Sequence, residues 1–169
     1  MSGPQQPTTA LAERPPERIE PWRGVEWQRL WLSLQSRPWT ALAVVPASSG
    51  APREFTLKIA VTLARTGMIH LGSSIHVADA TDLSLGSVVS FQEEMNQCRR
   101  SGDRILLALA PLGDNPITET LAQSADCSLL CVLFETMAAA EAKRTVKKIG
   151  KDRFIGSTIF RAAELANVK

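Results

Sequence analysis

Residues 40–66 read TALAVVPASSGAPREFTLKIAVTLART, and this stretch decides the fold. Its beginning, residues 40–46, is a short apolar run with β-branched residues, which predicts a buried strand. A loop follows, and residues 53–66 then show a helical pattern that we expect to close at Gly67, a residue type suited to the C′ position. A strand that leads through a loop directly into a helix is the repeating unit of α/β proteins.

The same alternation of apolar runs and amphipathic stretches continues along the chain. Apolar runs of strand length predict further strands at residues 74–78, 104–110, 127–134 and 153–157. Amphipathic patterns predict helices at residues 27–37, 87–100, 116–124, 136–149 (with Thr136 as the N-cap) and 161–166. Continuous apolar strands that alternate with helices indicate a parallel sheet covered on both faces. We therefore expect an α/β fold, a three-layer sandwich with a mainly parallel sheet of about five strands.

Length and composition indicate one domain with a tail. The chain has 169 residues, enough for a single domain with a full core. Residues 1–21 are proline-rich with little apolar content, so we expect a disordered tail, followed by a single domain over residues 22–169. No apolar run reaches the ~20 residues that a membrane span needs, and the N-terminus shows no secretory signal. A cytoplasmic protein without a transmembrane segment is expected.

Charge and metal-binding residue types argue against several functions. The 19 basic and 17 acidic residues give a net charge of +2, too balanced for binding nucleic acid by bulk charge. The three cysteines form no CxxC pair, and with only two histidines we expect neither a metal site nor a disulfide framework. Cys127 and Cys131 fall on the same face of one strand and are expected to pack in the core. His76 alternates with apolar neighbours, so we expect it in the interior.

The loop after the first strand is where an α/β protein would hold a phosphate. Ligands bind at the carboxyl ends of parallel strands, and a helix that begins there offers free amides to an anion. A working phosphate loop needs glycines for close approach, a lysine, and a serine or threonine for magnesium. A single glycine remains in this loop, whose candidate positions are Ser48, Ser49, Gly50, Pro52, Arg53 and Thr56.

Several motifs occur in an order known from one protein family. They are Glu26-Trp27-Gln28-Arg29-Leu30, Ser48-Ser49 with Pro52-x-Glu54, and the stretches 61–64 (VTLA), 75–80 (IHVADA), 102–111 (GDRILLALAP) and 125–132 (ADCSLLCV). In this order they resemble the catalytic domain of the bacterial tyrosine kinases of capsular and exopolysaccharide export. Those kinases belong to the MinD/ParA-like group of P-loop ATPases. The resemblance covers about residues 25–157 and implies a P-loop NTPase-like fold.

The positions that carry the chemistry of that family hold other residue types here. The resemblance places Thr56 at the phosphate-loop lysine, Leu57 at the magnesium-binding serine and Ala108 at the magnesium-side aspartate, while the loop glycines fall on Arg53 and Phe55. MgATP would lose its main counter-charge and its magnesium contacts. The chain also has no tyrosine, so it cannot phosphorylate itself as those kinases do. We expect a pseudoenzyme with no catalytic residue, no cofactor and no metal.

Further residues have a functional and a structural interpretation. Asp79 matches an aspartate of the family's second strand. It is either a residual catalytic or metal-side carboxylate or, as we favour, a cap of the following turn with Thr81 and Asp82. The basic stripe on the penultimate helix could meet anionic lipid or an acidic partner, or be a solvated face. In the resembled family the first helix makes subunit contacts, which implies a homo-oligomer as one option. The interface candidates are Trp22, Glu26, Arg29, Lys143, Arg144, Lys147 and Lys148.

The leading hypothesis is a pseudo-ATPase that acts as a regulator or scaffold through protein–protein interaction in bacterial exopolysaccharide synthesis and export. As partner the resemblance implies the cytoplasmic part of a membrane chain-length regulator, or an active homologue, which would recruit the chain to the inner membrane. Two alternatives stay open: a nucleotide-binding enzyme with an unconventional phosphate loop around Arg53, and a MinD/ParA-like accessory protein of cell division. No nucleic-acid partner is expected.

Overall fold

The sheet at the centre of the molecule has five strands, and all its pairings are parallel. The computed structural model describes residues 20–136, 138–166 and 168; most of the expected tail, residues 1–19, lies outside the described residues. The strands are β1 (Ala41–Pro46), β2 (Ile75–Asp79), β3 (Arg104–Ala108), β4 (Cys127–Leu133) and β5 (Phe154–Phe160). They lie in the order β2-β3-β1-β4-β5, so β1 is central and β2 and β5 are the edges. The predicted α/β fold with a parallel sheet is confirmed.

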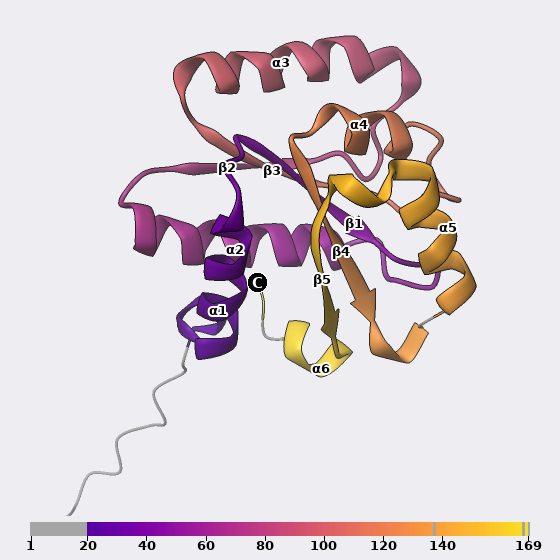
Figure 1. The fold of residues 1–169 in the computed structure, drawn as a ribbon, viewed down its shortest axis with the longest axis horizontal. Coiled ribbons are helices and arrows are strands. Elements are labelled where there is room, and N and C mark those ends of the chain that lie inside the picture. The colour runs from indigo at the N-terminus through magenta and orange to yellow at the C-terminus, as the bar shows by residue number, and fades with distance from the viewer. Residues whose placement is uncertain (1–19, 137, 167, 169) are drawn as a thin grey trace, which may run out of the picture.

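Helices cover both faces of the sheet, which gives three layers (Figure 1). They are α1 (Val25–Ser33), α2 (Phe55–Leu71), α3 (Val88–Ser101), α4 (Thr118–Ser124), α5 (Ala139–Ile149) and α6 (Ala162–Leu165). Helices α1, α2 and α6 pack on the first face, in one core with Leu42 and Val44 of β1. Helices α3, α4 and α5 pack on the second face, over Ala43 and Val45. None of the helices in the described ranges is long and apolar enough to cross a membrane.

The positions of β1 and β4 explain their apolar composition. Every residue of both strands is buried, because each strand has neighbours on both sides and helices above and below. Cys127, Leu129 and Cys131 of β4 belong to the first-face core, whereas Leu130 and Val132 pack under α5. The two cysteines therefore lie in the core, as predicted. Burial raises the pKa of Cys127 to about 11 and also raises the pKa of Cys131, so both are neutral thiols at neutral pH.

Helix α2 extends past its predicted end. It continues to Leu71, and Gly72, with a φ of 66°, is the residue that ends it. Gly67 lies inside the helix, where a Cβ atom would come within 2.4 Å of both the Trp31 ring and the Ile75 side chain. The predicted role of Gly67 as the C′ residue was therefore wrong. A glycine is needed here because α2 packs closely against α1 and β2.

Two further local predictions were wrong. Thr136 does not cap the helix after β4, because it closes a 3-10 turn and α5 begins only at Ala139. His76 is not an interior residue: its side chain is 49% exposed, and its Nε2 lies 3.6 Å from an Asp103 carboxylate oxygen. The alternation that suggested an interior position belongs to β2, and an edge strand exposes part of its surface.

Candidate functional site

The loops at the carboxyl ends of the strands leave a small cavity where the chain changes sides of the sheet. Strand β1 continues into α2 on the first face, whereas its neighbours β3 and β4 continue into α4 and α5 on the second face. Such divergence opens a crevice in α/β sheets. A cavity of about 210 Å³ lies here, lined by residues 47–49, residues 111–113 and the α5 side chains Glu141, Arg144, Thr145 and Lys148.

The first turn of α2 is directed into the protein rather than toward this cavity. Thr56, which the resemblance aligns with the phosphate-loop lysine, is 1% exposed, and its Oγ1 donates a hydrogen bond to the Leu109 carbonyl oxygen at 2.8 Å. The Phe55 ring is buried and packs edge-on against Phe160, with 6.1 Å between ring centroids. Leu57 packs against the first-face core. These side chains hold the turn in place, and none of them lines the cavity.

The middle of the loop after β1 is fixed by close contacts. The Pro52 carbonyl oxygen accepts a hydrogen bond from the first amide of α2 at 2.9 Å. Gly50 lies so near Thr136 that an added Cβ would come within 2.8 Å of the Thr136 Cβ. Arg53 pairs with Asp82 in the loop after β2, and its side chain is 67% exposed. Arg53 is thus an exposed charge outside the cavity, not a substitute for the missing lysine inside it.

The two serines of the loop bind protein groups of the β4–α5 connection. The Ser48 hydroxyl donates a hydrogen bond to the Thr136 carbonyl oxygen at 3.0 Å. The amide and the hydroxyl of Ser49 both donate to one carboxylate oxygen of Glu141, at 2.8 Å and 3.1 Å. These bonds, the one from the amide above all, hold the pKa of Glu141 below its ordinary value of 4.5. An anion of the protein itself therefore occupies the loop amide that a phosphate would use.

Glu141 was not among the residues singled out from the sequence. In the chain it is one acidic residue in the first turn of α5, a common position that suggests no partner. Its contact with Ser49 spans 92 positions and exists because parallel pairing of β1 and β4 sets their following loops side by side. The sheet order, which was not predicted, is the signal that would have found it.

Acidification should release this contact. A carboxylate whose pKa is lowered in the folded protein stabilises the fold above its ordinary pKa, and that contribution is lost as the pH falls through the lowered value. We expect the Ser49 amide proton resonance to titrate with a midpoint below 4.5. In Ser49→Ala, which keeps the backbone donor, the midpoint should move part of the way up. In Glu141→Gln the titration should vanish, whereas a wild-type midpoint at 4.5 or above would contradict the contact.

Asp79 caps its own turn, as favoured from the sequence. Its Oδ1 accepts hydrogen bonds from the Thr81 amide at 3.1 Å and the Thr81 hydroxyl at 2.6 Å. The Ala108 side chain is fully buried at the end of the neighbouring strand. Across the described part of the chain, no group of three or more His, Cys, Asp and Glu residues could hold a metal ion.

The structure separates the interface candidates into two places. On α5, Arg144 and Lys148 line the 210 Å³ cavity, whereas Lys143 and Lys147 are exposed and lie outside its lining. Trp22 and Glu26 line a second, larger hollow, which lies on the first face. Arg29 is not part of that lining; its guanidinium lies 3.5 Å from a Glu26 carboxylate oxygen on the helix surface.

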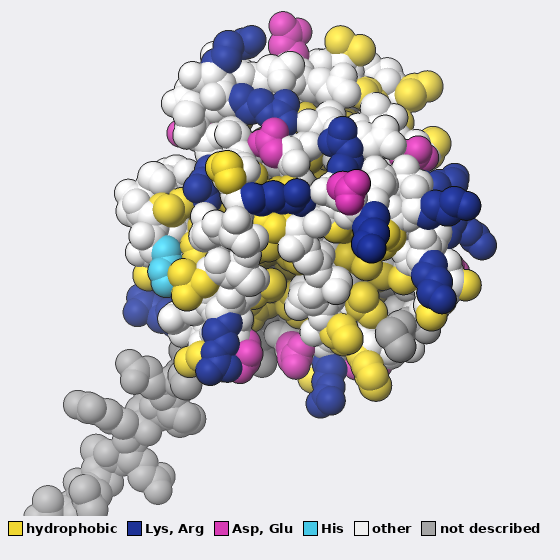
Figure 2. Space-filling view, viewed as in Figure 1, with side chains coloured by type: hydrophobic (Ala, Val, Ile, Leu, Met, Phe, Trp, Pro, Cys, Tyr) yellow, Lys and Arg dark blue, Asp and Glu magenta, His cyan; other side chains and the backbone are white. Residues whose placement is uncertain are grey.

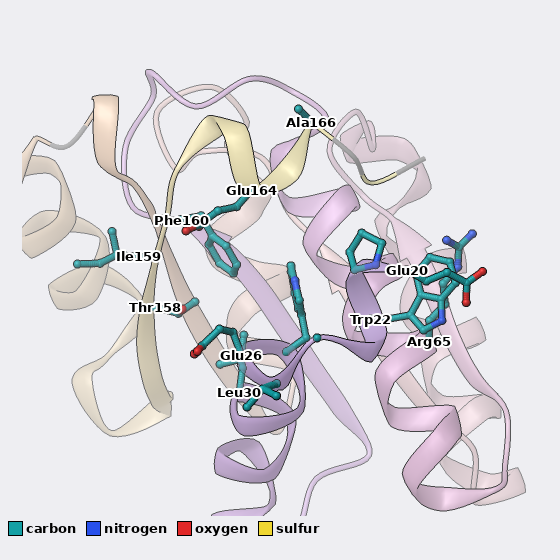
Figure 3. A pocket seen from close by; sticks show the side chains of 14 residues that line it. Glu20, Trp22, Glu26, Leu30, Arg65, Thr158, Ile159, Phe160, Glu164 and Ala166 are labelled. Carbon is teal, nitrogen blue, oxygen red and sulfur yellow. The ribbon is translucent and has the colours of Figure 1, made fainter. Parts of the chain in front are cut away.

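The second hollow, called here the groove, has a volume of about 1330 Å³ and lies between the start of α1 and the end of β5 (Figure 3). Trp27 and Phe160 pack against each other at its base, with ring centroids 5.4 Å apart. Arg65 of α2 stacks over the Trp22 ring at 4.4 Å. Figure 2 shows hydrophobic side chains gathered in a hollow between the side of α1 and α2 and the side of β5 and α5. The acidic residues Glu20, Glu26 and Glu164 also line the groove, which makes it unsuited to a polyphosphate.

Only part of the groove could be found from the sequence, because its lining comes from segments far apart in the chain. Trp22 and Glu26 were singled out, but Phe160 and Arg65 were not.

Comparison of the chain with protein-family models gives no match, and comparison with curated proteins gives none either. The resemblance to the bacterial tyrosine kinases therefore rests on the quoted motifs alone.

Proposed function

We propose that this chain is a non-catalytic protein that regulates or scaffolds other proteins by binding them, on an α/β framework like that of P-loop NTPases. The observation that carries the proposal is that the side chains of the first turn of α2 face the protein interior rather than the cavity; we call this turn closed. Thr56 stands where a phosphate-loop lysine would, and its hydroxyl is buried and bonded to Leu109 inside the protein. A phosphate at this loop would find no lysine at position 56 to neutralise it, and Lys58, the cation in the first turn of α2, does not line the cavity.

The cavity at the strand ends supports the same proposal. Its volume of about 210 Å³ is below the about 300–1,000 Å³ of ordinary ligand pockets. The Glu141 carboxylate on the Ser49 amide would repel a phosphate at that donor. A larger hollow among the described residues lies elsewhere, in the groove, whose lining includes Trp22, Trp27 and Phe160. Tryptophan in particular is enriched where proteins bind proteins.

The resemblance supplies the biological setting of the proposal, bacterial exopolysaccharide synthesis and export. The partner would be the cytoplasmic part of a membrane chain-length regulator, or an active homologue of this chain. Its gene should then lie among genes for glycosyltransferases and an outer-membrane exporter. Localisation of the protein at the division site would favour a cell-division accessory role instead.

Calorimetric titration of ATP and of ADP, each with magnesium, into the purified chain tests the non-catalytic assignment. We expect no saturable heat up to millimolar nucleotide, because the loop lacks its lysine and Glu141 covers the Ser49 amide. Micromolar, magnesium-dependent binding would overturn the proposal. A circular dichroism spectrum of the same preparation, recorded after the titration, checks that the protein was folded.

A second candidate is an enzyme that binds a phosphate in an unconventional way. The observation that favours it is the presence of two cations, Arg144 and Lys148, in the lining of the small cavity. If nucleotide does bind, Arg144→Ala should abolish the binding, while Arg53→Ala, which changes a residue outside the cavity, should leave it intact. The reverse pattern would point to a site at the exposed Arg53–Asp82 pair.

A further inference from the structure

The two edges of the sheet differ in how well they are protected against pairing with another strand. Strand β2 is short and carries His76 and Asp79, polar residues of the kind that discourage edge pairing. Strand β5 reads FIGSTIF without a charged residue or a proline, and it runs to Phe160, past the predicted end at residue 157. Its Ile159 side chain is 60% exposed. A long, uncharged and partly apolar edge is a ready template for a further strand.

The hydrogen bonds of the sheet show which backbone groups of β5 are free to pair. The Ala47 amide donates to the Cys131 carbonyl oxygen at 2.8 Å, so Cys131 directs its backbone groups toward β1. Because these directions alternate along a strand, Leu130 and Val132 direct theirs toward β5. Their register partners are Ser157 and Ile159, which must then direct their amides and carbonyls away from β4, to the open edge. The reason is that, in a parallel ladder, only one residue of each register pair directs its backbone amide and carbonyl toward the other strand.

We propose that β5 pairs with β5 of a second copy of this chain, antiparallel and about a twofold axis at Thr158. In this arrangement the free backbone groups of the two copies face each other. Ser157 of one copy lies opposite Ile159 of the other, and Ile159 of the first lies opposite Ser157 of the second. Each such pair exchanges amide-to-carbonyl hydrogen bonds. A twofold axis at Ser157 would instead pair Ile159 with Ile155, where the ladder between β5 and β4 is irregular. A centre at Ile159 would need the Arg161 amide, which already donates to Glu164 at 2.9 Å.

The side chains of β5 are self-complementary in this register. Thr158 meets Thr158 of the second copy on the first face, a favourable cross-strand pair. Phe160, whose ring packs against Trp27 and Phe55 of its own copy, lies opposite Gly156, which brings no side chain against it. No charged side chain belongs to the paired segment, so a second copy brings no like charges together. This match of the strand to itself is why we commit to a second copy rather than to a segment of another protein.

The same edge continues into further exposed apolar surface on the second face. Ile159 pairs in register with Val132, whose side chain packs under α5, so Ile159 lies on that face beyond the cover of the helix. Phe134, directly after β4, is 55% exposed, with the Arg161 guanidinium 5.8 Å from its ring centre. Pairing through one short strand buries an area at the low end for specific interfaces, so we expect a dissociation constant in the micromolar range. Strand β5 contributes nothing to the 210 Å³ cavity, so the inference does not depend on the absence of nucleotide binding. Thr158, Ile159 and Phe160 do line the groove, so the dimer shares surface with the groove that supports the proposed protein-binding role.

Sedimentation velocity over a concentration series tests the dimer. We expect the full chain to shift from monomer to dimer between micromolar and millimolar concentration. Ile159→Lys places a charge on the exposed edge and should weaken the dimer at least about tenfold. His76→Lys, which changes a half-exposed residue on the opposite edge, should leave the dimer unchanged. A chain that stays monomeric throughout the series, or a dimer that Ile159→Lys leaves intact, would overturn the inference.

Cysteine cross-linking tests the register. In an antiparallel pair, Thr158 opposite itself is a non-hydrogen-bonded position with about 4.5 Å between Cα atoms, within the range of a disulfide. Thr158→Cys should therefore form a disulfide-linked dimer under mild oxidation. Residue 157 of one copy lies diagonally across from residue 157 of the other, beyond disulfide range, so Ser157→Cys should not form a linked dimer. The wild-type chain, oxidised in the same way, shows whether the native cysteines Cys98, Cys127 and Cys131 cross-link by themselves. Cross-linking of Ser157→Cys but not of Thr158→Cys would overturn the proposed axis.

Discussion

Trp31→Ala is expected to lower the free energy of unfolding by about 3–5 kcal/mol, the range for removing a fully buried tryptophan. Trp31 is 1% exposed and packs edge-to-face against Trp39, with ring centroids 5.8 Å apart at 77°. Its ring also fills the space above Gly67, where even one Cβ atom would come within 2.4 Å. Neighbours so tightly placed cannot close the cavity that the truncation leaves, so the loss should lie in the upper part of the range.

Urea unfolding followed by far-ultraviolet circular dichroism measures this loss without depending on tryptophan fluorescence. The matched control is Leu32→Ala, the next residue on α1, whose side chain is 58% exposed and which should change stability by no more than about 0.5 kcal/mol. A loss below about 1 kcal/mol in Trp31→Ala would contradict the packing of α1 on α2.

The sheet and its helices could be predicted because their signal is local. In β1, neighbouring residues such as Val44 and Val45 face opposite cores, and both must be apolar because helices cover both faces. Gly67 and Thr136 were misplaced for the opposite reason. Gly67 looked like a helix end, but its role is set by Trp31, far away in the chain. Thr136 looked like a cap, but the chain makes a 3-10 turn there that brings its carbonyl to Ser48.

The candidate site divides in the same way. The loop between β1 and α2 could be predicted, since it depends on consecutive residues; that Thr56 replaces a phosphate-loop lysine stays a prediction from the resemblance. The occupation of the loop by Glu141 could not, because it depends on which strand lies beside β1. The groove depends on β5 lying beside α1, as the Trp27–Phe160 contact shows, and the open edge of β5 depends on the order of the strands in the sheet. Surfaces made by distant segments leave no pattern in either segment alone.

Thr56→Lys, which introduces a lysine where the resemblance aligns the one of a phosphate loop, is expected to destabilise the protein by about 3–5 kcal/mol rather than to create an ATP site. The Thr56 side chain is 1% exposed and bonded to the Leu109 carbonyl oxygen, so an ammonium group there would be buried without a countercharge. Chemical unfolding measures the loss, and a thermal-shift series with MgATP measures binding. We expect no rise in melting temperature with nucleotide.

Two substitutions at the same position separate the buried charge from the lost hydroxyl. Thr56→Ser keeps the donor to Leu109 and loses one buried methyl group, so it should cost about 1 kcal/mol. Thr56→Val keeps the shape but leaves that carbonyl without its hydroxyl donor, which should cost about 1–3 kcal/mol. If Thr56→Lys instead folds with wild-type stability and MgATP raises its melting temperature, the turn can open around a lysine. The chain would then be one substitution away from nucleotide binding, and the closed turn would no longer support a non-catalytic role.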